Sequence, residues 1–354
     1  MKQGRSLKEA KAEKASKKRR AKARRRAAVL ITEIFIFLGL IGVMFVMSKY
    51  GKFQLNPFEE EDIYKNEGVE KEGYQTIALF GGDSRDGELG AGTHADTIMI
   101  VSIERKTKQV RVLSIYRDLL TMQMDGNIRK ANSAYFLGGP EEAINMLNRN
   151  FDLDIEDYVT VDFKAMAVMV DLLGGIDVDV KENEAAEMNN YINESAQVVG
   201  GKATTIRPGM QTLDGVGALT YARIRKDVGG DYARTERQRV VIQKMLEKVK
   251  STDLKTINQI INEVFGHIAT SFTMREIIEL APGLLKYELA ETAGYAFERT
   301  DGNIQGIGSV VVPVGVTENV QKMHQFLYPT LEYQVSEVVK NIATEIEILS
   351  GQQE

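Results

Sequence analysis

Short apolar runs alternate with longer helical patterns between residues 75 and 250. Three of these runs, residues 75–80, 97–103 and 109–115, are rich in Val, Ile, Leu and Phe and are bounded by glycines or charges. Such runs predict strands. The charged residues 104–108 join the second and third runs, which predicts a β-hairpin there. The first run ends at Gly81 and Gly82, which indicates a strand entering a tight loop.

Helical periodicity occurs at three places between and after these strands. Residues 141–150 and 231–250 predict helices, and residues 163–173 predict a mostly apolar helix that stops at Gly174 and Gly175. Residues 176–180 alternate apolar and acidic side chains, as an edge strand does. Strands interleaved with helices predict an α/β domain, with α-β-α layers around a mixed central sheet. Such sheets bind ligands at the ends of their strands.

A different pattern precedes this domain. Residues 27–47 are apolar except for Thr32 and Glu33, and 21 residues of helix span about 31 Å, the thickness of a bilayer core. We therefore expect one transmembrane helix. A cleaved signal peptide is the alternative, but the run is long for one and no small-x-small cleavage site follows it.

Charge sets the expected orientation. Residues 1–26 hold thirteen Lys and Arg against Glu9 and Glu13, a net charge of +11, whereas the whole chain carries −5. By the positive-inside rule residues 1–26 form a basic cytoplasmic tail, and everything from residue 48 onward is extracellular, so the chain is a single-pass protein of the cell membrane. Topology and anionic lipid already explain the tail, so we expect no nucleic-acid partner.

The remaining composition limits the chemistry. The chain has no Cys, which excludes disulfides, thiol catalysis and Cys-based zinc sites. Its three histidines, His94, His267 and His324, lack metal-ligand spacing, so a zinc hydrolase is not expected. Residues 48–73, with Pro57 and a run of four acids, predict an extracellular stalk. Residues 251–354 are expected to continue the extracellular domain as helices.

Arginines and aspartates are concentrated at the ends of the predicted elements. Between residues 221 and 239 there are five arginines and one lysine. The planar guanidinium binds phosphate oxygens in a bidentate manner, whereas a lysine acts as a point charge. The bias predicts a phosphate or pyrophosphate site.

The helix at 231–250 decides which arginines act together. Arg234 and Gln238 are four residues apart and share a stripe with apolar residues, so they are expected at the rim of the core, near a helix N-terminus that favours anions. Arg237 lies near the edge of that face and Arg239 points elsewhere. For both, an ordinary amphipathic helix with exposed arginines is an equal alternative.

Asp83 and Asp96 have two readings. Asp beside Gly and Ser is commonly turn or cap chemistry. Two carboxylates that face a phosphate site can instead hold Mg²⁺ together with substrate phosphates. If Asp96 holds the metal, Asp96→Asn should lower activity and leave the melting temperature nearly unchanged.

The motifs of the predicted domain resemble those of a known protein family. The segments at 77–85, 95–103, 112–118, 130–139, 157–163, 173–178, 213–215 and 221–238 occur in the order seen in the LytR-CpsA-Psr family, which the chain resembles from about residue 75 to 250. On this reading residues 74–250 are the catalytic domain. The chain departs from the family pattern at Tyr116, where proline is usual, at His94, where arginine is common, and at Arg239, where glutamine is frequent.

The resemblance implies a phosphotransferase that moves a glycopolymer from undecaprenyl pyrophosphate to a peptidoglycan hydroxyl through a phosphodiester. The family's carboxylates match Asp83 and Asp96, associated with Mg²⁺ or Mn²⁺. Its pyrophosphate-binding residues match Arg85, Arg117, Arg223, Arg225, Arg234 and Gln238. Of these positions Asp83, Arg85, Asp96 and Arg117 are the expected catalytic group. An apolar groove for the lipid is expected from residues 97–103 and 163–173, with plain core packing as the alternative.

Two other functions stay open. A polyprenyl-pyrophosphate phosphatase would use the same anion site with water as the acceptor. A membrane-tethered transcriptional attenuator would need a DNA-binding surface in the cytoplasm, where only the basic tail is expected. The sequence does not distinguish teichoic acid, capsule or another wall glycan as the polymer.

Overall fold

The computed structural model describes residues 54–58, 60–82, 88–226, 228–273, 275–277 and 286–351. The predicted cytoplasmic tail and transmembrane helix at 1–47 lie outside these residues, as do Asp83 and Arg85. Within the described ranges, none of the helices combines the length and hydrophobicity that crossing a bilayer demands.

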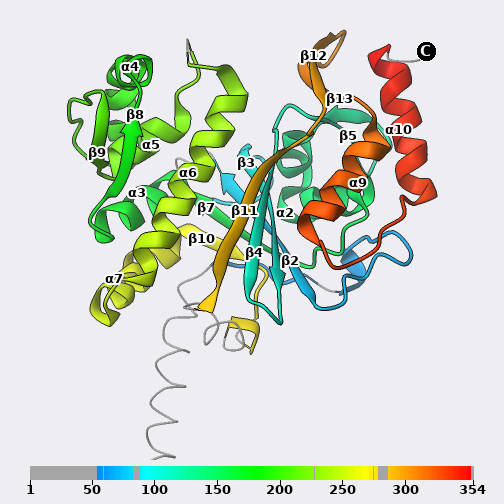
Figure 1. The fold of residues 1–354 in the computed structure, drawn as a ribbon, viewed down its shortest axis with the longest axis horizontal. Helices are drawn as coiled ribbons and strands as arrows, with labels where there is room; N and C mark the ends of the chain where they lie inside the picture. The colour runs from blue at the N-terminus through cyan, green and yellow to red at the C-terminus, as the bar shows by residue number, and fades with distance from the viewer. Residues whose placement is uncertain are drawn as a thin grey trace, which may run out of the picture. The chain divides into compact units, whose positions relative to one another are not determined.

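A seven-stranded mixed sheet forms the centre of the fold (Figure 1). Its strands, in spatial order, are β1 (Gln54–Leu55), β10 (Ile268–Thr270), β7 (Asp157–Asp162), β2 (Tyr74–Gly82), β3 (Ala95–Glu104), β4 (Gln109–Ile115) and β11 (Glu288–Tyr295). Strand β3 runs antiparallel to β2 and β4, whereas β7 is parallel to β2 and β11 is parallel to β4. The fold is therefore α/β with a mixed central sheet, as the sequence predicts.

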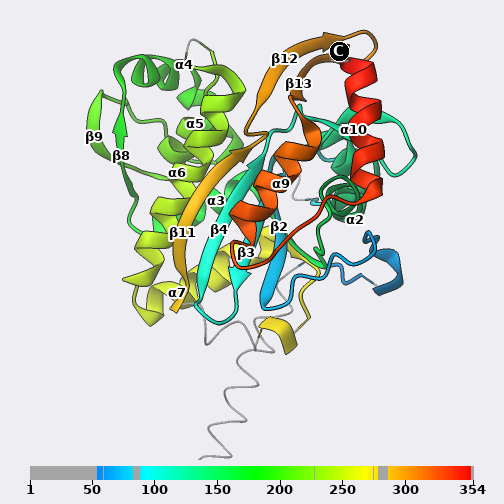
Figure 2. The same cartoon turned by 45° about the vertical axis from the view of Figure 1, so that its right-hand side comes forward.

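Side-chain alternation along the strands gives the sheet two buried faces. Ala78 and Phe80 of β2 belong to a cluster that includes residues of α2 (Asn132–Phe151) and α9 (Val316–Leu327). On the other face Ile77 packs with Phe272. Helices α3 (Phe163–Leu172) and α7 (Leu254–Val264) pack against each other and share a cluster with Val161 and Ile268 of the sheet. Helices α5 (Gly215–Arg223) and α6 (Gly230–Lys250) extend this layer (Figures 1 and 2).

Smaller elements surround these three layers. They are η1 (Glu60–Asp62), the hairpin of β5 (Leu120–Met122) and β6 (Ile128–Lys130), the hairpin of β8 (Ile176–Val180) and β9 (Gly209–Leu213) with α4 (Glu182–Val199), η2 (Phe265–His267), the hairpin of β12 (Arg299–Ile304) and β13 (Gly308–Pro313), and α10 (Glu337–Ser350). Ile176, Val178 and Val180 of β8 are buried and the acidic residues between them are exposed, which matches the predicted alternation.

The predicted elements of residues 75–250 are confirmed, most of them close to their predicted bounds. Helix α2 begins nine residues before the predicted residue 141, because its sequence contains Gly139 and Pro140, which hide the helical pattern. Gly139 has φ 71° and ψ −156°, so the helix is interrupted there. Helix α3 begins where expected because the Asp162 side chain accepts a hydrogen bond from the backbone N–H of Ala165.

Two predictions about the flanking segments were wrong. Residues 251–354 are not only helical, since they supply β10 and β11 to the central sheet and the β12–β13 hairpin. Strand β11 has a single buried residue, Tyr295, and lies at the edge of the sheet, where backbone pairing holds it and the side chains give little pattern. The stalk prediction also fails for its described part, because Val69 and Asn66 are buried and Asn66 donates to the backbone carbonyl of Arg149.

Candidate anion-binding site

Asp96 and Arg117, two of the residues expected in the phosphate site, lie at one end of the central strands. In the strand register Gly82, at the end of β2, lies beside both Ala95 of β3 and Asp162 of β7. Asp96 therefore sits at the start of β3, next to the point where the chain leaves β2. Strand β4 ends at the same end of the sheet, since Ile115 pairs with Ile98, and Arg117 follows two residues later.

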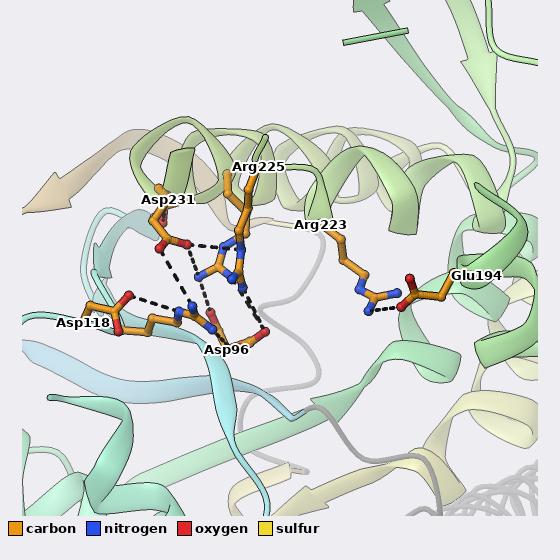
Figure 3. A network of polar contacts seen from close by, with 9 residues as sticks. Asp96, Asp118, Glu194, Arg223, Arg225 and Asp231 are labelled. Atoms are coloured by element: carbon orange, nitrogen blue, oxygen red, sulfur yellow. Dashed lines mark hydrogen bonds and ion pairs between the residues drawn. The ribbon is translucent and has the colours of Figure 1, made fainter. Parts of the chain in front are cut away.

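Asp96 is the centre of a cluster of ion pairs (Figure 3). Its Oδ1 accepts a hydrogen bond from Arg117 Nη1 at 2.7 Å, and its Oδ2 lies 3.4 Å from Arg225 Nη2 and 3.7 Å from Arg234 Nη1. The three arginines come from the end of β4, the segment after α5 and the first turn of α6. Arginines from distant parts of the sequence thus converge on Asp96, a carboxylate that the sequence analysis assigns to a metal and not to these arginines.

Asp231 joins the same arginines, and the sequence reasoning did not assign it a role. Its carboxylate lies 3.0 Å from Arg234 Nη2, 3.3 Å from Arg225 Nε and 3.9 Å from Arg117 Nη2. Burial raises the pKa of Asp231 above its ordinary value, and Arg117 and Arg225 oppose the rise. Its position at the start of the predicted helix, three residues before Arg234, was the available signal.

Asp118 was missed in the same way. It lies 3.4 Å from Arg117 Nε and 3.0 Å from Lys130 Nζ. Burial lowers the pKa of Arg117, but Asp96 and Asp118 outweigh this effect and leave the pKa raised. Lys130 is the basic group that reasoning from arginine bias overlooked.

The charges of this cluster favour binding of an anion. Four basic side chains face three carboxylates, which leaves an excess of positive charge. The Arg234 side chain is 2% exposed, and its buried Nε has no hydrogen-bond acceptor. A buried guanidinium donor without an acceptor is costly, and an anionic ligand would satisfy it.

Arg223 lies apart from this cluster. Figure 3 shows Arg223 directed away from Arg225 and toward Glu194, whose Oε1 it contacts at 3.2 Å. Its guanidinium also stands 5.1 Å from the ring centre of Phe163. Both Arg223 and Gln238 line the same cavity as the cluster. The structure therefore brings Arg117, Arg225 and Arg234 together, and places Arg223 across the cavity.

The cavity has a volume of about 1070 Å³ and continues from the arginines into apolar surroundings. Its apolar lining includes Phe163, Met166 and Met169 of α3, Val241, Ile242 and Met245 of α6, Val264 of α7 and Ile268 of β10. Of the two segments expected to form a groove, α3 does so. Strand β3 contributes only Asp96 and Thr97 to the cavity lining, because apolar side chains of this strand such as Ile98 and Ile100 are in the core.

Arg237 and Arg239 do not belong to the site. Arg237 is 3% exposed and donates to Glu184 and to the carbonyls of Ile224 and Val228. The alternative of exposed arginines on an amphipathic helix is therefore wrong for Arg237. It is a structural side chain that joins α6 to α4 and to the segment after α5. Arg239 is half-buried near Tyr116, on the β11 side of α6.

Known proteins are similar to this chain in both sequence and fold. The LytR_cpsA_psr family model matches residues 46–325. A polyisoprenyl-teichoic acid–peptidoglycan teichoic acid transferase, TagV of Bacillus subtilis, is 29% identical over 61% of this chain and 54% of its own length, so the chain spans about half of that relative.

Two solved structures are similar in fold. A protein of Enterococcus faecalis, described as a transcriptional regulator, is 27% identical with a TM-score of 0.60, and the match covers 79% of this chain and 96% of that one. TagT of Bacillus subtilis with bound octaprenyl pyrophosphate lipid is 21% identical with a TM-score of 0.53, over 75% of this chain and 95% of that one. With the family model matching most of its length, this chain belongs to the LytR_cpsA_psr family.

Proposed function

We propose that this protein is a membrane-anchored extracellular phosphotransferase that moves a glycopolymer from undecaprenyl pyrophosphate to peptidoglycan through a phosphodiester. The observation that carries this proposal is the convergence of Arg117, Arg225 and Arg234 at the mouth of a cavity with an apolar interior. A polyprenyl pyrophosphate has the same two parts, an anionic head and an apolar tail.

The relatives support the same substrate class. TagV is named as a teichoic acid transferase, and a TagT structure holds octaprenyl pyrophosphate. By analogy the head group would lie among the arginines of this chain and the tail between α3 and α6. Asp83 and Arg85, which follow β2 in the sequence, would complete the site, Arg223 would contact the substrate from across the cavity, and Gln238 would contact it from one turn after Arg234 on α6.

Mg²⁺ or Mn²⁺ is the proposed cofactor, held by Asp83 and Asp96. Among the described residues no three His, Asp or Glu side chains gather as a complete metal site. Mg²⁺ nevertheless binds commonly through one or two carboxylates plus substrate phosphates. Because Asp96 faces three guanidinium groups, we infer that pyrophosphate would take over these groups and leave Asp96 available to the metal. When bound, the ion would neutralise charge on the phosphate oxygens.

The reaction follows from the charges. The oxygen of a peptidoglycan hydroxyl attacks the phosphorus nearer the glycan, the P–O bond to the polyprenyl phosphate breaks, and polyprenyl phosphate leaves with the electron pair. Arg117, Arg225 and Arg234 stabilise the negative charge that develops on the phosphate oxygens. The hydroxyl proton passes to a carboxylate, for which Asp83 and Asp96 are the candidates.

Anchoring by residues 27–47, with the N-terminus in the cytoplasm and the domain outside, is part of the proposal. It rests on the basic tail and the apolar run of the sequence. A reporter that works only outside the cell, fused to the C-terminus, tests it. Activity of the reporter supports this orientation, and an inactive but well-expressed fusion contradicts it.

A transfer assay tests the function itself. The full-length protein in detergent is given a polyprenyl-pyrophosphate-linked glycopolymer and purified peptidoglycan, and polymer bound to the wall is measured. We expect Arg234→Ala to lower transfer by about 10² or more, as for the loss of a comparable charge-stabilising donor. Arg105→Ala, at the opposite end of β3, is the matched control and should transfer normally. Release of free phosphorylated polymer with peptidoglycan present, without attachment, would instead identify a phosphatase.

A further inference from the structure

Arg299, the first residue of β12, lies against two tyrosine rings that also contact each other. Its guanidinium carbon is 4.4 Å from the ring centre of Tyr232 and 4.9 Å from that of Tyr116. The two rings meet edge to face, with centres 4.9 Å apart and planes at 86°. Arg299 Nη1 also donates to the carbonyl of Ala296 at 2.8 Å. We call Tyr116, Tyr232 and Arg299 the tyrosine–arginine clamp.

Each tyrosine of the clamp is the chain neighbour of a residue in the anion site. Tyr116 directly precedes Arg117, and Tyr232 directly follows Asp231. Arg117 and Asp231 are themselves an ion pair of the cluster. Movement of either ring would therefore move the backbone that carries one of these two charged groups.

The clamp is fixed on its outer side by the C-terminal part of the chain. The hydroxyl of Tyr232 donates to Asp301 of β12. The hydroxyl of Tyr116 lies against β11, where a Cβ on Gly294 would come within 2.6 Å of it. The Tyr116 ring is 5% exposed, and burial raises the pKa of its hydroxyl, so the ring is neutral and packed at physiological pH.

We propose that Arg299 is a positioning residue, through which β11 and β12 hold Arg117 and Asp231 in the geometry that binds pyrophosphate. This inference rests on the proposed function, because it assumes that the cluster binds a pyrophosphate. It gives residues 288–304 a role in the site, although none of them lines the cavity. Cation–π contacts strengthen as the cation is removed from water, and Arg299 is half-buried beside the two rings.

Binding of inorganic pyrophosphate to the full-length protein in detergent, by titration calorimetry, tests the clamp. We expect Arg299→Ala to weaken binding roughly tenfold, since small displacements of positioned groups can cost up to about 10²-fold. Arg299→Lys keeps a cation beside both rings and should restore binding to within about threefold of the wild type. Arg105→Ala removes an exposed arginine of the same type and should bind normally.

Two further measurements separate positioning from simple loss of charge or of folding. Tyr232→Leu leaves the net charge unchanged and should weaken binding as Arg299→Ala does. The defect of both variants should persist at high salt, where long-range attraction is screened, and in samples whose thermal unfolding shows them fully folded at the assay temperature. Wild-type affinity in a folded Arg299→Ala or Tyr232→Leu variant would overturn the clamp while leaving the proposed function intact. Failure of the wild type to bind pyrophosphate would overturn both.

Discussion

Replacement of Asp96 by asparagine tests separately the two interactions proposed for this carboxylate, one with the arginines and one with Mg²⁺. Asp96 contacts Arg117, Arg225 and Arg234. Asparagine keeps the side-chain shape and removes the negative charge. Without divalent metal, we therefore expect Asp96→Asn to bind pyrophosphate more tightly than the wild type, because one repulsive charge is removed and the guanidinium groups are released.

The size of this gain can be worked from the charges. Two unit charges about 7 Å apart at an effective dielectric constant of about 20 interact by roughly 2 kcal/mol, which corresponds to about 30-fold in affinity. The Asp96 side chain is 21% exposed, so solvent reduces the effect and this value is an upper bound. We expect a gain between about three-fold and 30-fold.

Mg²⁺ should reverse the order of the two proteins. The wild type gains affinity from a metal held by Asp96, whereas Asp96→Asn does not, and its glycopolymer transfer should fall by about 10² or more. Stability should fall as well, by about 1–3 kcal/mol, because three arginines lose a shared partner. The sequence alone predicted almost no change in melting temperature, since it did not reveal these three contacts.

Calorimetric titration of pyrophosphate with and without Mg²⁺ is the assay. Asp125→Asn, which alters an exposed carboxylate paired with Arg129, is the control and should match the wild type. Asp96→Asn with unchanged affinity in the absence of metal would refute the electrostatic reasoning. An equal Mg²⁺ effect in the wild type and the variant would remove Asp96 from the metal site.

Three further predictions concern other parts of the chain. Arg237→Ala should lower the free energy of unfolding by about 3–5 kcal/mol, because it leaves buried Glu184 unpaired, with unchanged pyrophosphate affinity; a urea-denaturation loss below about 1 kcal/mol would contradict the structural role. Burial lowers the pKa of His324 to about 3, so near pH 6.5 the unfolded chain binds a proton that the folded chain does not bind. The contribution of His324 to the free energy of unfolding is therefore full above pH 6.5, and it should fall by about 2 kcal/mol between pH 7 and pH 5. Subtracting the stability curve of His324→Gln isolates this contribution from that of Asp157, whose raised pKa acts in the opposite direction, and a flat difference would contradict it. Met166→Gln, in the apolar part of the cavity, should weaken octaprenyl pyrophosphate binding roughly tenfold through the cost of burying an amide, and leave inorganic pyrophosphate binding unchanged; equal affinity for the lipid would place the tail elsewhere.

The sequence predicted the inner strands and helices because their burial produces a periodic pattern. Strand β3 and helix α3 carry long runs of apolar side chains, and both appear close to their predicted bounds. Strand β11 escaped prediction because its place at the sheet edge comes from backbone pairing with β4. The stalk prediction for residues 48–73 failed in its described part for a similar reason, since asparagine and aspartate contacts hold residues 66 and 71 against the domain.

The candidate site was predictable in its residue types and less so in its geometry. A bias toward arginine near strand ends is visible in a sequence, and Arg117, Arg225 and Arg234 do converge. Which arginine is structural depends on three-dimensional partners, so Arg237, one turn from Arg234, could not be separated from it before its contact with Glu184 was known. The clamp at Arg299 joins segments more than 60 residues apart, and periodicity carries no signal for such a contact.

A structure of the full-length protein with a bound polyprenyl pyrophosphate tests the central claim most directly. We predict that the phosphate oxygens lie within hydrogen-bond distance of Arg117, Arg225 and Arg234, and that the tail follows the apolar side chains of α3 and α6. A head group bound away from all three arginines would contradict the account.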